Sequence, residues 1–152
     1  MRMHAVRSAL LLPLFAGAVF LACTGTMRHH GSLKVTLDRS FDLEAGKQAL
    51  IKDTGLVVRF ASVIGDSRCP KDVTCVWEGS AEVAIDLVKT SGSSTEDRST
   101  HTMKLATGRG PSEGADFGYA VHLLDVRPYP RSAGEHDWSV YSITLKVTAQ
   151  KN

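Results

Sequence analysis

Residues 66–79 of the chain read Asp-Ser-Arg-Cys-Pro-Lys-Asp-Val-Thr-Cys-Val-Trp-Glu-Gly. This stretch holds two of the three cysteines and one of the two tryptophans. An alternating apolar run, Leu56 to Ile64, leads into it, and a second run, Ala81 to Lys89, leads out of it. Alternation with a period of two is typical of a β-strand with one buried face. The stretch is therefore predicted to be a loop that joins two strands.

The same alternation recurs along the rest of the chain. Short apolar runs are separated by Gly, Pro, Asp and Ser, and no window of a dozen residues has convincing helical spacing. Further strands are expected near residues 33–37, 49–51, 100–105, 119–126 and 140–147. Seven or eight short strands at such intervals predict one all-β domain over residues 33–152, a single antiparallel β-sandwich of the immunoglobulin-like kind.

The connections between these runs carry the candidate binding residues. Residues 92–97 are expected to form a hairpin tip, residues 107–116 a glycine-rich loop, and residues 127–134 a loop, because Pro128 and Pro130 donate no ladder hydrogen bonds. Alternate loops of a sandwich meet at one end. We therefore expect the loops 66–79, 107–117 and 127–134 to form one working surface. Its candidate contact residues are Arg68, Trp77, Arg109, Arg127 and Tyr129.

The aromatic residues in these loops have two possible roles. An exposed tryptophan or tyrosine is a candidate hot spot for a partner, whereas a buried one covers the end of the core. Packing is the expected role of Trp77 and Trp138. Tyr129, between two prolines, is expected to be the more exposed residue.

The first 22 residues have the pattern of a secretory signal peptide. Arg2 and Arg7 give a basic start, and the uncharged apolar run from Ala9 to Ala22 is too short to span a bilayer comfortably. The sequence Phe20-Leu21-Ala22-Cys23 resembles the lipobox of bacterial lipoproteins, with Phe20 in place of the usual leucine. The resemblance implies cleavage before Cys23 and a lipid on that cysteine.

A lipidated Cys23 would place the protein in the bacterial cell envelope, on the periplasmic side of the outer membrane or at the surface. Residues 23–32 would then be the lipidated N-terminus and a polar, flexible tether. The alternative is a secreted or periplasmic soluble protein with a spare thiol.

The charge of the mature chain argues against nucleic-acid binding. The chain has 18 Lys and Arg and 16 Asp and Glu, and residues 1–22 contain two arginines and no acid. Removal of the signal leaves 16 residues of each sign. A formally neutral domain lacks the basic surface that nucleic-acid binding requires.

The cysteine count fits an exported protein. If Cys23 carries lipid, Cys69 and Cys75 remain as a pair with five residues between them. In an oxidising compartment they are expected to close a small disulfide loop. Zinc ligation is the less favoured alternative, because the two cysteines have no second Cys/His pair at a matching distance.

Other chemistry has weaker support in the sequence. The nucleophile elbow G-x-S-x-G is absent, as are the metal motifs H-E-x-x-H and the EF-hand loop. Asp66, Asp72 and Glu78 are oxygen ligands that could hold Ca²⁺. We favour a turn-capping role for Asp66 and ordinary solvation or ion pairs for the other two. No enzyme activity, metal or cofactor is expected.

The pattern Asp66-Ser-Arg-Cys-Pro-x-x-Val-x-Cys-x-Trp-x-Gly-x-Ala81 resembles a recurring motif of uncharacterised bacterial lipoproteins and secreted proteins. The similarity extends from Leu56 to Pro130. It implies an exported domain and brings no activity with it.

A second resemblance is to the chagasin-like inhibitors of papain-type cysteine proteases, which are immunoglobulin-like sandwiches. Gly108-Arg109-Gly110 and Arg127-Pro128-Tyr129 match two of their three inhibitory loops in order, and a terminal strand follows. The first inhibitory motif, Asn-Pro-Thr-Thr-Gly, is absent, and the predicted disulfide loop stands in its place. The sequence thus predicts a non-enzymatic binding module, with an envelope protein as a possible partner and protease inhibition as the alternative.

Overall fold

The computed structural model of the chain describes residues 33–91, 98–132 and 137–150. The predicted signal peptide, Cys23, the predicted tether and the predicted hairpin tip at residues 92–97 lie outside the described residues. Among the described residues, no helix is long and apolar enough to cross a membrane.

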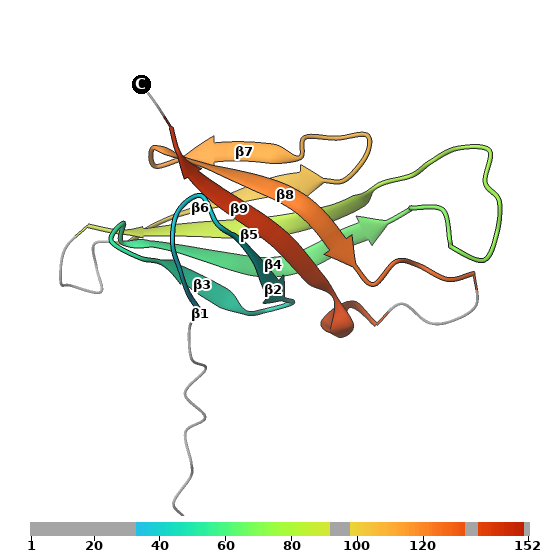
Figure 1. Cartoon of the computed structure of the whole chain (residues 1–152), viewed down its shortest axis with the longest axis horizontal. Coiled ribbons are helices and arrows are strands. Elements are labelled where there is room, and N and C mark those ends of the chain that lie inside the picture. Colours follow the sequence, from blue (N-terminus) through green and yellow to red (C-terminus); the bar gives the residue numbers. More distant parts are fainter. Residues whose placement is uncertain (1–32, 92–97, 133–136, 151–152) are drawn as a thin grey trace, which may run out of the picture.

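Two β-sheets pack face to face and form a sandwich (Figure 1). One sheet has the order β1-β3-β4-β5-β6 and the other has the order β2-β9-β8-β7. The strands are β1 (Leu33–Val35), β2 (Ser40–Glu44), β3 (Gln48–Ile51), β4 (Leu56–Asp66), β5 (Ala81–Thr90), β6 (Arg98–Ala106), β7 (Glu113–Asp116), β8 (Tyr119–Arg127) and β9 (Ser142–Ala149). A single 3₁₀ turn, Trp138–Val140, precedes β9.

The alternating apolar residues of the sequence form the buried inner faces of the two sheets. Alternate residues of β5, Ala81, Val83, Ile85 and Leu87, are fully buried, and β9 buries Ile143, Leu145 and Val147 in the same way. The removal of these side chains from water is the main contribution to the stability of such a core. The predicted all-β sandwich is confirmed.

Within each sheet, most neighbours are also consecutive in the chain. Strands β3 to β6 form one antiparallel run and β7 to β9 form another, while β2 pairs with β9 and β1 pairs in parallel with β3. The chain therefore passes between the sheets at β1–β2, β2–β3 and β6–β7. Two packed sheets of this kind are the sandwich architecture that immunoglobulin-like domains share. The order of the strands within the sheets differs from that of an immunoglobulin domain.

Two strands were not predicted from the sequence. Strand β2 was missed, and β7 forms inside the stretch expected to be a glycine-rich loop. The sequence of β7, Glu-Gly-Ala-Asp, has no β-branched residue, and pairing with β8 supplies its hydrogen bonds. Gly114 allows the strand to lie close to the core, because a Cβ there would meet the Met103 sulfur at 2.7 Å.

The three predicted loops lie at the same end of the sandwich (Figure 1). Strand β4 ends at Asp66 opposite Ala81, where β5 begins. Strand β6 ends beside the start of β5, and β8 ends at Arg127 opposite the start of β9. We call this region the loop end. It comprises residues 66–80, 107–112 and the described part of 127–141.

Candidate functional site

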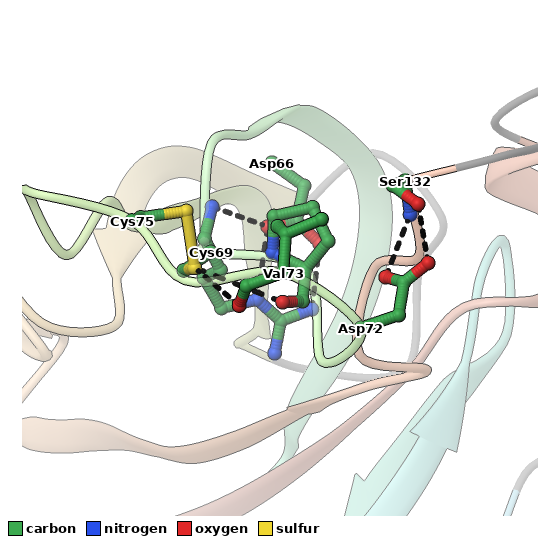
Figure 2. Close-up of a disulfide and its surroundings, with 8 residues drawn as sticks. Asp66, Cys69, Asp72, Val73, Cys75 and Ser132 are labelled. Atoms are coloured by element: carbon green, nitrogen blue, oxygen red, sulfur yellow. Dashed lines mark hydrogen bonds and ion pairs between the residues drawn. A yellow bond between two sulfur atoms is a disulfide. The ribbon is translucent and has the colours of Figure 1, made fainter.

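The first feature of the loop end is the disulfide between Cys69 and Cys75 (Figure 2). Their Cα atoms lie 5.8 Å apart, within the range of ordinary disulfides. The predicted pairing is confirmed. The bond closes residues 69–75 into a small ring and reduces the freedom of the chain that carries Trp77.

A buried ion pair holds the base of this loop. The side chains of Arg68 and Asp66 are 4% and 0% exposed, and Arg68 Nη2 lies 2.6 Å from Asp66 Oδ2. Arg68 Nε donates a second hydrogen bond to Asp66 Oδ1 at 2.9 Å, so the pair is bidentate. The Arg68 backbone N–H also donates to Asp66 Oδ1, at 3.1 Å. Asp66 therefore caps the turn, as predicted, and also neutralises the guanidinium.

The same arginine reaches across to the other sheet. Its Nη1 donates to the carbonyl of Val126 at 2.6 Å, and its Nη2 donates to the carbonyl of Pro128 at 2.7 Å. The Tyr141 hydroxyl completes the group by donating to Asp66 Oδ2 at 3.0 Å. We call Asp66, Arg68 and Tyr141 the buried clamp. It ties the end of β4 to the end of β8 and to the residue before β9.

The ionisation states in the clamp follow from these contacts. Burial alone would raise the pKa of Asp66, but hydrogen bonds from Arg68 and its positive charge outweigh burial and lower the pKa. Burial and the bond to Asp66 raise the pKa of Tyr141. The clamp is therefore a carboxylate, a guanidinium and a neutral phenol at neutral pH. All three groups have protein partners.

A second set of contacts joins the disulfide loop to the segment after β8. The backbone N–H of Lys71 donates to the Pro130 carbonyl at 3.2 Å. Asp72 accepts a hydrogen bond from the Ser132 backbone N–H at 2.9 Å and another from its hydroxyl. Figure 2 shows Asp72 turned toward Ser132, away from the disulfide. These hydrogen bonds lower the pKa of Asp72.

The start of the glycine-rich segment is hydrogen-bonded to the place where the disulfide loop ends and β5 begins. Thr107 exchanges hydrogen bonds with Ala81, through its backbone at 2.9 Å and its hydroxyl at 3.0 Å. Ser67 pairs with Ser80 in a similar way, at 2.9 to 3.1 Å. Gly79 is required there, because a Cβ would lie 1.8 Å from the Ser67 carbonyl oxygen. All three loops are thus joined by specific hydrogen bonds.

The residues directly after the disulfide ring are apolar and exposed. Val76 is 89% exposed and Trp77 is 73% exposed, with the half-exposed Val73 nearby in the sequence. The guanidinium of Arg109 lies 5.9 Å from the centre of the Trp77 ring. The expectation that Trp77 packs on the core is wrong. Trp138 is 40% exposed and packs against Tyr141, with ring centres 5.2 Å apart.

The other candidate contact residues have partners within the protein. Tyr129 was expected to be exposed, but it is half-buried, with Arg68 at 4.4 Å and Lys71 at 5.3 Å from its ring centre. Arg127 pairs with Asp125 at 3.1 Å and Asp42 at 3.3 Å. Arg68 is buried, so it positions the loops and offers no free guanidinium. Trp77 and Arg109 are exposed, and Arg127 is exposed as well although it is paired.

The buried clamp was missed by sequence reasoning, which placed Arg68 on the surface. The spacing Asp-x-Arg directly after a strand was the available signal, since it puts an Asx turn and a counter-charge together. Val76 was also missed, because it is a single β-branched residue within a loop. In the described part of the chain, no group of three His, Cys, Asp or Glu side chains is placed to hold a metal ion.

No family model, curated protein or solved structure matches this chain.

Proposed function

We propose that the protein is a non-enzymatic binding module of the bacterial cell envelope, anchored by lipid on Cys23, and that it contacts an envelope protein through its loop end. The anchor rests on the signal-like residues 1–22 and the lipobox resemblance. The contact surface rests on the geometry of the disulfide loop. A secreted or periplasmic form would use the same surface.

The observation that carries the proposal is that Val76 and Trp77 are exposed on a loop held by a disulfide and a buried ion pair. An exposed tryptophan supplies a large apolar contact area. The disulfide, the buried clamp and the Asp72–Ser132 contact hold its loop in place before any partner arrives. Little chain entropy would then be lost on binding, which favours affinity.

A binding role suits the ionisable groups of the loop end better than catalysis. A catalytic acid or base has to reach a substrate. Asp66 and Arg68 are the buried charged groups there, and each is occupied by protein partners. They serve to position the loops.

Protease inhibition remains a second candidate, because of where two short motifs lie. Gly108-Arg109-Gly110 and Arg127-Pro128-Tyr129 are at the same end as the disulfide loop, as an inhibitor that inserts several loops into a cleft would need. The half-burial of Tyr129 leaves Trp77 and Arg109 as the exposed contacts. An inhibitor of this kind would bind a papain-type protease stoichiometrically.

The test is capture of crosslinked partners from intact envelopes with the wild type, Trp77→Ala and Leu124→Ala. Leu124 is a matched control, because it is an apolar residue, 52% exposed, on β8. We expect one partner that is lost with Trp77→Ala and kept with Leu124→Ala. Equal recovery by the three proteins would overturn the proposed surface. Inhibition of papain by the wild type, lost with Trp77→Ala, would select the second candidate.

A further inference from the structure

A groove lies between the disulfide ring, the segment after β8 and the start of β9. It has a volume of about 560 Å³, which lies within the range of small-molecule sites. Lys71 comes from the disulfide ring, and most of the wall comes from the end of β8 and the segment after it. The 3₁₀ turn and the first residue of β9 supply the rest. The lining residues are Lys71, Arg127, Pro128, Tyr129, Arg131, Val140 and Ser142.

The lining has three cations and no acid. Arg127 is neutralised by Asp42 and Asp125. Within the described residues, neither Lys71 nor Arg131 has a carboxylate close enough for a salt bridge. The nearby Asp72 is hydrogen-bonded to Ser132, and the positive charge of Arg131 also acts on it. Lys71 and Arg131 therefore bring positive charge to the groove, and within the described residues neither forms a direct ion pair.

The remaining wall is apolar. Pro128, the half-buried Tyr129 and the exposed Val140 give a surface that fits a ring or a short hydrocarbon chain. Tyr129 is held in place by Arg68 behind it, at 4.4 Å from the ring centre, and Arg68 is fixed by the buried clamp. The Tyr129 part of the wall is therefore held in place before any ligand binds, and Lys71 lies over its ring, 5.3 Å from the centre.

We propose that this groove binds a small organic anion, namely one carboxylate or phosphate head group on a ring or apolar body. Arg131 matches such a head group because a guanidinium donates two parallel hydrogen bonds to it, and Lys71 adds a second charge. The lining does not include Val76, Trp77 or Arg109, so anion binding does not require the proposed protein partner.

The test is a titration of the ¹⁵N-labelled protein, followed by chemical shifts, with three probes that share one ring: benzoate, phenyl phosphate and neutral benzyl alcohol. We expect saturable shifts at Tyr129 and Ser142 with at least one anion, and binding of benzyl alcohol at least tenfold weaker. The ratio of the two anions identifies the preferred head group. No saturable shift with either anion, or equal binding of the neutral probe, would overturn the proposal.

Variants separate the site from a general charge effect. Lys71→Met combined with Arg131→Gln keeps most of the side-chain volume and is expected to weaken anion binding at least tenfold. Arg109→Gln removes a cation at the same end without touching the groove and is expected to leave binding unchanged, as is Trp77→Ala. Wild-type affinity in the double variant, or an equal loss with Arg109→Gln, would contradict the assignment. The spectra themselves report whether each variant is folded.

Discussion

Removal of the Arg68 side chain would leave the buried carboxylate of Asp66 without a counter-charge. Breaking a buried ion pair in this way costs about 3–5 kcal/mol. We expect Arg68→Ala to lower the free energy of unfolding by that amount, measured by urea denaturation. Arg59→Ala is the matched control, because its contact with Asp86 is 3.8 Å long and half-exposed. Its expected cost is at most about 1 kcal/mol, and equal effects of the two variants would contradict the clamp.

The lowered pKa of Asp66 makes the clamp sensitive to acid. A carboxylate with a lowered folded-state pKa contributes stability that is fully present above its unfolded pKa of about 4. That contribution is lost as the pH falls through the folded-state value. We expect the stability difference between wild type and Asp66→Asn to shrink as the pH is lowered from 5 toward 2, roughly the range in which such a pair titrates. A difference independent of pH would show that Asp66 is not ionised in the fold.

At the scale of the elements, the close contact at Gly79 gives a direct prediction. A methyl group there would lie 1.8 Å from the Ser67 carbonyl oxygen, so the pairing of residues 67 and 80 cannot persist. We expect Gly79→Ala to destabilise the protein by more than about 2 kcal/mol, as severe steric changes do. Gly65→Ala is the control, since nothing lies within 4 Å of its added Cβ. Thermal unfolding of both variants would show whether the glycine is required.

The strands that carry the core could be predicted from the sequence. Strands β4, β5, β8 and β9 are rich in apolar and β-branched residues, and β5 and β9 bury every second residue over most of their length. Strand β2 also alternates, with Phe41 and Leu43 buried between polar residues, so it was missed although the signal was present. Strand β7 could not be predicted in this way. Strand β7 is an edge strand of small and acidic residues, and its structure comes from its pairing with β8, which is a tertiary contact.

The candidate site was predicted at the level of loops and not of side chains. The meeting of the three loops follows from the sandwich architecture. The half-burial of Tyr129 goes with its contact to the buried Arg68, 4.4 Å from the ring centre. Arg68 is itself held by contacts with carbonyls about sixty residues away, which local patterns do not encode.

For the whole molecule, the disulfide and the buried clamp are expected to act together on the loop end. The chain-entropy model gives about 2 kcal/mol for so small a ring. We expect Cys69→Ala combined with Cys75→Ala to lower stability by about that amount and to leave the sandwich folded. Hydrogen exchange should then rise in residues 69–77 and stay slow in β5 and β9. Global unfolding of the double variant would mean that the disulfide holds the domain, and not just the loop.

The central claim is that the molecule contacts its partner through Val76 and Trp77, the exposed residues that follow the disulfide ring. The most direct measurement is photo-crosslinking in living cells, with a photoreactive amino acid placed at Val76 in one variant and at Leu124 in another. Both positions are exposed and apolar, but Val76 directly follows the disulfide ring whereas Leu124 lies on β8. The claim predicts one discrete crosslinked species from position 76 and none from position 124. The same species from both positions, or a species from position 124 alone, would contradict it.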